Sequence, residues 1–131
     1  MLEVSNLCLL YGRHVALRDL SLEVCRRETV VILGANGAGK SSLLKAIAGL
    51  VRPDAGARIT FEGRNITGTS AHDVVEAGIA LVPEGRGVFG DLTVEENLAL
   101  GAYARRARDG ARDRQAFVYE LFPKLRDRRR Q

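Results

Sequence analysis

Eight consecutive residues, Gly34 to Ser41, have the types and spacing needed to hold a phosphate group. They read Gly34-Ala35-Asn36-Gly37-Ala38-Gly39-Lys40-Ser41 and match the pattern G-x-x-x-x-G-K-[ST]. The glycines allow the backbone to curl until successive N–H groups point inward, which forms an anion-binding nest. Lys40 can then reach the β- and γ-phosphates of a nucleotide, and the Ser41 hydroxyl can ligate Mg²⁺. This pattern predicts a phosphate-binding loop rather than a purely structural glycine turn.

The segments on both sides of this loop have the patterns that such a site requires. Residues 29–33 form an unbroken, mostly β-branched apolar run, typical of a strand buried on both faces of a parallel sheet. Residues 41–48 have apolar positions at helical spacing, and Gly49 ends that helix. The amides and positive dipole end of the helix would then face the phosphate. Residues 79–82 predict a second fully buried strand, ended by Pro83.

Alternation and capping signals place the remaining elements. Residues 1–25 alternate between apolar and polar side chains, which predicts antiparallel strands. Ser70 is a good N-cap for a helix that Gly78 closes, and Thr93 with Glu96 forms a capping-box pattern at the start of another helix. The other expected features are a turn at residues 11–13, a glycine-containing loop over residues 84–91, and a helix over residues 112–122 that is interrupted near Pro123.

Composition places the chain among soluble globular domains. Apolar residues make up 46% and charged residues 27% of the chain. No apolar run approaches the roughly 18 residues that a membrane-spanning helix needs. The start lacks the basic region of a signal peptide, so a cytoplasmic location is expected. Cys8 and Cys25 have no metal-like spacing and are expected to be structural thiols.

The net charge of +4 is concentrated towards the C-terminus. Residues 1–104 carry ten basic and twelve acidic side chains, whereas residues 105–131 carry ten basic and four acidic ones. A basic tail can bind nucleic acid or anionic lipid. Here, acidic side chains are mixed with the arginines at helical spacing, and no nucleic-acid-binding motif accompanies them. A solvated helical face is therefore favoured, and no nucleic-acid partner is expected.

Three segments together resemble the ATP-binding subunits of ABC transporters. The loop, extended by Ser42, is similar to the phosphate loop of that family, and Tyr11 with residues 15–22 looks like its A-loop region. Residues 81–98 are similar to its Q-loop and early helical subdomain, and their Pro-Glu-Gly-Arg sequence resembles branched-chain amino-acid importers. The resemblance covers nearly the whole chain. It implies that the Tyr11 ring stacks on adenine, whereas the residues alone also allow simple packing at a strand end.

Glu84 stands where most members of that family have glutamine. An acid after residues 79–82 also looks like a Walker B carboxylate, but Pro83 intervenes and a glycine-rich sequence follows. The resemblance therefore places Glu84 near the γ-phosphate and Mg²⁺ as a sensor, with the metal or a water between carboxylate and phosphate. The expected ligands of ATP are Tyr11, Gly34, Asn36, Gly37, Ala38, Gly39, Lys40, Ser41 and Ser42; those of Mg²⁺ are Ser41 and Glu84; Lys40 and Glu84 are the expected catalytic residues.

The expected fold is an incomplete α/β P-loop NTPase core of the ABC ATPase type. Its expected regions are an antiparallel β region over residues 1–28, a P-loop core through the Q-loop over residues 29–92, and the start of a helical subdomain over residues 93–131. An incomplete parallel sheet would leave apolar edges exposed. Poor solubility or self-association is therefore expected.

The resemblance implies the ATP-binding subunit of an importer, for branched-chain amino acids, that lies on the inner face of the cell membrane. It would pair with a second nucleotide-binding subunit and contact transmembrane permease subunits through the Q-loop region. The Walker B, signature and switch-histidine motifs of the family come later than Gln131, and His14 and His72 match none of these roles. We therefore expect this chain to bind ATP without hydrolysing it; a natural non-hydrolysing nucleotide-binding module is the alternative.

Overall fold

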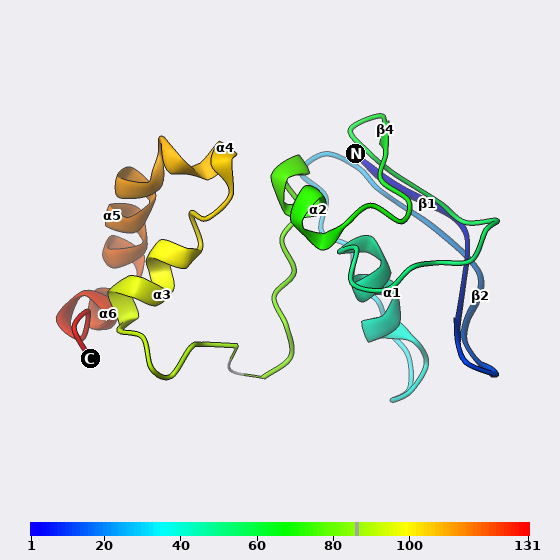
Figure 1. Cartoon of the computed structure of the whole chain (residues 1–131), viewed down its shortest axis with the longest axis horizontal. Coiled ribbons are helices and arrows are strands. Elements are labelled where there is room, and N and C mark those ends of the chain that lie inside the picture. The colour runs from blue at the N-terminus through cyan, green and yellow to red at the C-terminus, as the bar shows by residue number, and fades with distance from the viewer. Residues whose placement is uncertain (86) are drawn as a thin grey trace. The chain divides into compact units, whose positions relative to one another are not determined.

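The structure is a computed structural model that describes residues 1–85 and 87–131. It divides into two compact units, residues 1–81 and residues 82–131. The first unit contains the strands, and the described residues of the second form helices and loops (Figure 1).

The first unit is built on a four-stranded antiparallel sheet in the order β2-β1-β3-β4. The long strands β1 (Leu2–Tyr11) and β2 (His14–Val24) form a hairpin, and β3 (Arg58–Phe61) pairs with the first half of β1. The short strand β4 (Arg64–Asn65) follows β3 through a tight turn at Glu62 and Gly63, both of which have positive φ. The antiparallel strands predicted within residues 1–25 are therefore confirmed.

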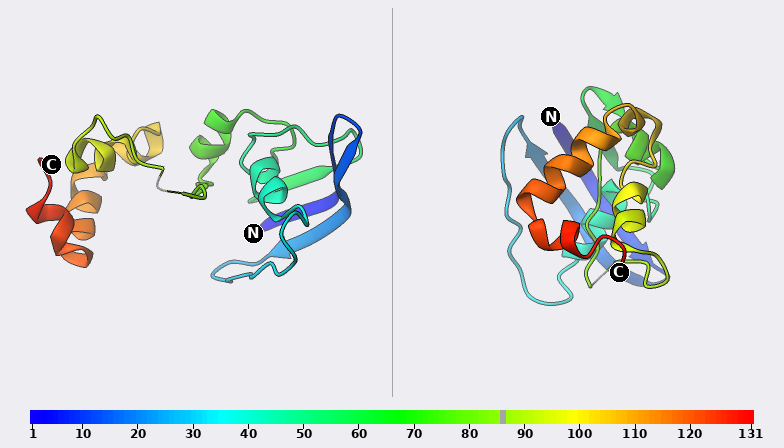
Figure 2. Two further views of the ribbon diagram at one scale, coloured as in Figure 1. Left: turned by 90° about the horizontal axis from the view of Figure 1, so that it is seen from below. Right: turned by 90° about the vertical axis from the view of Figure 1, so that its left-hand side faces the viewer.

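Helix α1 (Lys40–Ile47) lies against one face of this sheet (Figure 2). Its buried side chains share one apolar cluster with residues from β1, β2 and β3. The buried members of this cluster are Val4, Leu7, Leu9, Leu17, Leu43, Ala46, Ile47, Ile59 and Ile66. Gly49 follows the helix with φ of 72°, as its predicted end requires.

Helix α2 (Ala71–Ala77) follows the same sequence rules. The Ser70 hydroxyl accepts a hydrogen bond from the Asp73 N–H, and Gly78 closes the helix with φ of 114°. Val74 is the buried side chain of this helix. The predicted cap, helix and terminating glycine are all confirmed.

The two apolar runs that predicted buried parallel strands do not form strands, and both predictions are wrong. Residues 29–33 and 79–82 are irregular, and the side chains of Val31, Leu33 and Val82 are 74%, 88% and 89% exposed. A fully buried strand requires hydrogen-bonded neighbours on both sides and helices on both faces. Within residues 1–85 and 87–131, no strand pairs with either run. Apolar composition alone therefore did not decide the local structure.

The described residues of the second unit form four short helices. They are α3 (Val94–Leu100), α4 (Arg105–Arg108), α5 (Ala111–Leu121) and α6 (Pro123–Asp127). Thr93 and Glu96 form the predicted capping box at the start of α3. Pro123 begins α6, so the interruption expected at this proline is also confirmed. None of the described helices is long and apolar enough to cross a membrane.

Candidate nucleotide-binding site

The loop between residue 33 and α1 has the curled backbone that its glycines predict. Gly37 and Gly39 have φ of 84° and 88°, a region that side-chain-bearing residues rarely occupy. The Ala38 N–H donates to the Ala35 carbonyl at 3.2 Å, which closes a turn around Asn36 and Gly37. The loop then runs directly into α1, whose first residue is Lys40.

The Lys40 side chain folds back over this loop. Its Nζ donates hydrogen bonds to the carbonyl oxygens of Gly34 and Ala35, both at 2.7 Å. An ammonium group has three N–H donors, so Lys40 can hold the loop and a phosphate oxygen at the same time. The Lys40 side chain, which was predicted to reach the phosphates, is therefore held against the loop by two hydrogen bonds.

The start of α1 favours negative charge. Its N-cap is Gly39, no side chain caps the helix, and no acidic residue lies in its first turn. The first amides of a helix have no acceptor within the helix, and the helix dipole is positive at this end. Ser41 and Ser42 lie in this first turn, Ser41 exposed and Ser42 half-buried. Backbone amides, a lysine and two hydroxyl groups therefore meet where the loop becomes a helix.

Gly39 is seated closely on strand β2, a contact that the loop motif alone did not predict. A Cβ atom at Gly39 would lie 2.5 Å from the Ala16 carbonyl oxygen and 2.6 Å from Leu17 Cδ2. Ala16 and Leu17 therefore occupy the space beside the loop, and Leu17 is only 7% exposed. Alternation did not predict this position, because Leu17 is out of phase with Leu20 and Leu22 in an alternating strand. A register shift between Leu17 and Leu20 brings Leu17 to the buried face.

Tyr11 lies at the end of β1, paired with His14 across the hairpin turn. Its side chain is 45% exposed. A ring in this position is accessible to a flat ligand such as adenine. Stacking on adenine stays a prediction for Tyr11, as does the assignment of the other loop residues to individual ligand atoms.

Glu84 lies in the second unit, in an exposed bend between residue 83 and α3. Gly85 and Gly87 beside it have positive φ, in keeping with the predicted glycine-containing loop. The proposed roles of Glu84 at Mg²⁺ and the γ-phosphate remain predictions. Arg86 of the Pro-Glu-Gly-Arg sequence is outside the described residues.

Asn97 anchors the end of this loop to α3, a role that sequence analysis missed. Its Oδ1 accepts from the Phe89 N–H at 2.9 Å. Its Nδ2 donates to the carbonyls of Phe89, Leu92 and Thr93 at 3.0 to 3.1 Å. An asparagine within a short helix could have signalled this, because its amide competes for backbone groups.

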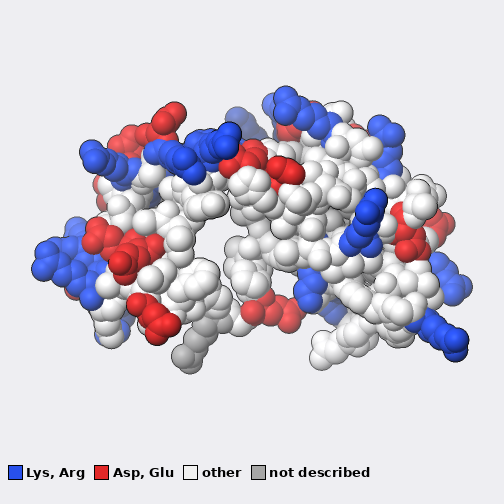
Figure 3. Space-filling model, in the orientation of Figure 1, with Lys and Arg blue, Asp and Glu red and all other residues white. Residues whose placement is uncertain are grey.

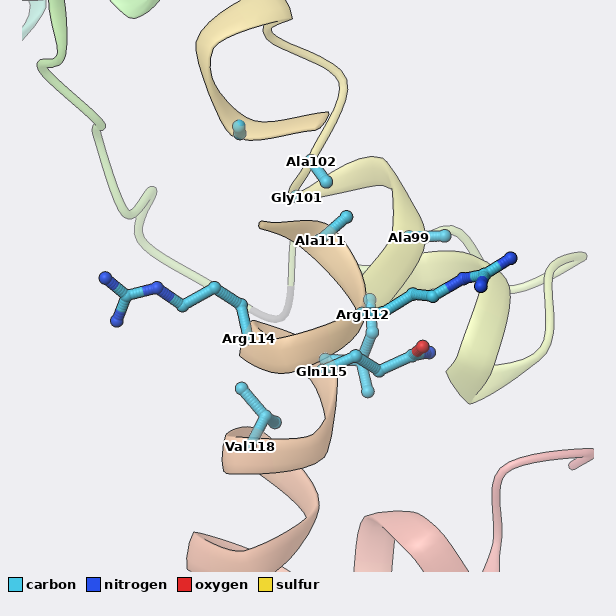
Figure 4. Close-up of a pocket in the computed structure, with 10 residues that line it drawn as sticks. Ala99, Gly101, Ala102, Ala111, Arg112, Arg114, Gln115 and Val118 are labelled. Atoms are coloured by element: carbon cyan, nitrogen blue, oxygen red, sulfur yellow. The ribbon is translucent and has the colours of Figure 1, made fainter. Parts of the chain in front are cut away.

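The second unit also has an apolar pocket of about 370 Å³ between α3 and α5. Figure 4 shows Ala99, Ala102, Ala111 and Val118 around it, with Arg112 and Arg114 directed to opposite sides. Its complete lining is Leu98, Ala99, Gly101, Ala102, Ala107, Ala111, Arg112, Arg114, Gln115 and Val118. Over the helices of this unit, basic and acidic side chains are intermixed on the face seen in Figure 3.

Known proteins are similar to this sequence over most of its length. Residues 17–130 match the family described as ABC transporter. The high-affinity branched-chain amino acid transport ATP-binding protein BraG of Pseudomonas aeruginosa is 42% identical over 128 residues, 98% of this chain and 54% of that protein. The ribose import ATP-binding protein RbsA 1 of Streptomyces coelicolor is 41% identical over 97 residues, 74% of this chain and 19% of that protein.

The fold is shared as well. The crystal structure of a nucleotide-free ATP-binding cassette from an ABC transporter has a TM-score of 0.79 and 26% identity, and the match covers 99% of this chain and 56% of that one. The chain thus spans about half the length of BraG and of this cassette. The predicted fold class, part of an ABC-type P-loop NTPase, is confirmed. With its matched residues, its phosphate loop and its fold taken together, the chain belongs to the ABC transporter family, as part of its ATP-binding cassette.

Proposed function

We propose that this chain binds Mg-ATP through residues 34–42 and forms part of the ATP-binding subunit of an ABC importer. The observation that carries the proposal is the position of Lys40, held by the loop carbonyls at the uncapped start of α1. The N–H groups of Gly37 and Gly39 and the first turn of α1 would surround the β-phosphate. Lys40 would reach the β- and γ-phosphates, and Tyr11 would stack on adenine.

Magnesium suits the donors that we propose for it, because hard cations prefer oxygen ligands such as hydroxyl groups and carboxylates. Ser41 supplies a hydroxyl group next to the phosphates, and Glu84 supplies the carboxylate in the proposed γ-phosphate sensor. The metal would neutralise charge on the phosphates. Hydrolysis further needs a group that orients the attacking water. We therefore propose hydrolysis for the assembled transporter and nucleotide binding for residues 1–131.

Branched-chain amino acids are the transported substrates that we propose. Support comes from the similarity to BraG over 98% of this chain. A ribose importer protein also matches, because the nucleotide-binding part of the family is shared between transporters of different substrates. The proposed partners are a second nucleotide-binding subunit and permease subunits, which would contact the Glu84 loop and hold the protein at the inner face of the membrane.

Titration of the chain with Mg-ATP tests the central proposal. Lys40→Ala is expected to weaken binding by at least tenfold, because it removes a charge-assisted contact to phosphate. Lys45→Ala is the matched control, since Lys45 lies on the same helix in its last turn, away from the loop. Equal affinity for wild type and Lys40→Ala would contradict the proposal. Binding without turnover would favour the non-hydrolysing alternative for the isolated chain.

A further inference from the structure

The phosphate loop packs against the β1–β2 hairpin at Gly39. Gly39, the last loop residue before α1, is packed against Ala16 and Leu17 so closely that a Cβ atom would overlap both. The atom of Ala16 that Gly39 contacts is a backbone carbonyl oxygen of strand β2. The atoms of Leu17 that it contacts belong to the side chain, so this contact can be altered by mutation without changing the loop sequence.

Leu17 is itself firmly held. It pairs with Leu9 across the hairpin, and Leu9 is fully buried. Leu43, in the first half of α1, belongs to the same buried cluster and is 1% exposed. The Leu17 side chain is therefore fixed by packing in the sheet and contacts Gly39 of the loop at the same time.

Gly39 controls the direction of the amides that follow it. It has φ of 88° and is the N-cap of α1, so its backbone sets how the N–H groups of Lys40 and Ser41 leave the loop. An anion-binding nest depends on the convergence of such N–H groups. A small shift of Gly39 would turn them away from a common point, with no loss of any phosphate-binding side chain.

We propose that Leu17 is a positioning residue for the phosphate loop: its side chain holds Gly39 in place and so keeps the amides at the start of α1 aimed at phosphate. This inference rests on the proposed function, because it assigns Leu17 to the same nucleotide site. Leu17 touches the loop and not the ligand. Its effect is therefore on phosphate affinity and leaves adenine recognition unchanged.

Two ligands separate these effects: Mg-ATP, and inorganic triphosphate with Mg²⁺, which has no base. Leu17→Ala is expected to weaken the binding of both by the same factor, about tenfold, equivalent to the loss of one charge-assisted hydrogen bond. Tyr11→Ala provides the contrast, because loss of an adenine platform would weaken Mg-ATP alone. Leu17→Met, whose side chain retains its reach, is expected to restore most of the affinity.

Leu7→Ala is the matched control for a general loss of stability. Leu7 lies on the same hairpin, pairs with Leu20 and is fully buried, and it does not contact Gly39 in the way that Leu17 does. Affinities are compared per folded molecule, with the folded fraction measured by circular dichroism. Leu7→Ala is expected to lower the thermal midpoint and to leave both affinities within about twofold of wild type. If Leu17→Ala does not fold, Leu17→Val gives the same comparison with a smaller truncation.

The outcomes distinguish this inference from the proposed function. If wild type binds both ligands and Lys40→Ala does not, but the Leu17 variants bind like Leu7→Ala, the positioning role is overturned and the ATP site stands. If Leu17→Ala weakens Mg-ATP but not triphosphate, the positioning role is also overturned. If wild type binds neither ligand, the proposed function fails, and the role of Leu17 fails with it.

Discussion

At the scale of single residues, backbone geometry limits what position 39 of the site tolerates. Gly39 combines a left-handed backbone with contact distances below 3 Å for any added Cβ atom. Removing the Leu17 side chain would relieve only part of that overlap, because the Ala16 carbonyl oxygen remains. The glycine is therefore required by the strand beneath it as well as by the turn.

Glu62, in the turn after β3, forms ion pairs with two cationic groups. Its carboxylate accepts from the Met1 amino group at 2.6 Å and from Arg26 Nη2. The hydrogen bond from the N-terminal amine, followed by that from Arg26, lowers the pKa of Glu62 from 4.5 to about 2. The cluster joins the turn after β3 to the start of β1 and to the segment after β2.

This cluster predicts a pH-dependent contribution to stability. Because the folded pKa of Glu62 is lowered, its contribution is fully present above pH 4.5 and is lost as the pH falls towards about 2. Thermal midpoints of wild type and Glu62→Gln should therefore differ at pH 7 and converge by about pH 2. Glu120→Gln, at an exposed position of α5, is the control. A midpoint difference that stays constant over this pH range would contradict the assignment.

At the scale of elements, Asn97 holds the end of the Glu84 loop to α3. The side chain accepts from the Phe89 N–H, and its two Nδ2 hydrogens are shared among three carbonyl groups. Asn97→Ala is expected to cost about 1–3 kcal/mol of stability if the unit unfolds in one step, at about 1 kcal/mol for each net hydrogen bond. It should also accelerate amide hydrogen exchange over residues 88–93.

The exchange pattern makes this prediction specific. Glu95→Ala, at an exposed position on the same helix, should leave exchange in residues 88–93 unchanged. Asn97→Asp keeps the acceptor for the Phe89 N–H but loses the amide donors, so it should not restore protection at Leu92 and Thr93. Equal exchange in wild type and Asn97→Ala would show that the side chain does not anchor the loop.

Elements with locally encoded ends could be predicted from the sequence. The Ser70 and Thr93 caps, Gly78 and Pro123 each act within one helical turn, and each lies where its pattern indicated. The phosphate loop was equally predictable, because its glycines and lysine act on adjacent backbone. The contact between Leu17 and Gly39 was missed because it depends on packing between two separate segments. The anchoring by Asn97 was missed because it depends on side-chain geometry within residues 89–97, which no pattern in that segment specifies.

At the scale of the whole chain, the error in residues 29–33 and 79–82 has a physical cause. Their sequence favours burial between other elements, but no described strand lies beside them. Alternation identified β1 and β2 because an antiparallel hairpin supplies its own partner. A parallel strand depends on partners from distant parts of a chain. The match to this 131-residue chain covers only 54% of BraG and 56% of the nucleotide-free cassette.

The exposed runs predict association of the isolated 131-residue chain. Residues 29–33 carry no charge and are rich in β-branched side chains, and Val31 and Leu33 are mostly exposed. Such a segment favours pairing with an identical one, because pairing satisfies backbone groups and buries apolar surface together. Sedimentation velocity should therefore show a molecular mass that rises with protein concentration.

Charge placed on this run should oppose the association. The double variant Val31→Lys and Leu33→Lys is expected to shift the chain towards monomer, because two like charges would face each other in every paired segment. Leu50→Lys is the control, since Leu50 is also exposed, at 57%, but lies outside the run. A wild-type chain that stays a stable monomer at all concentrations would contradict the prediction. If the double variant and Leu50→Lys lose association equally, pairing of residues 29–33 is not its cause. General charge repulsion would then explain the loss of association.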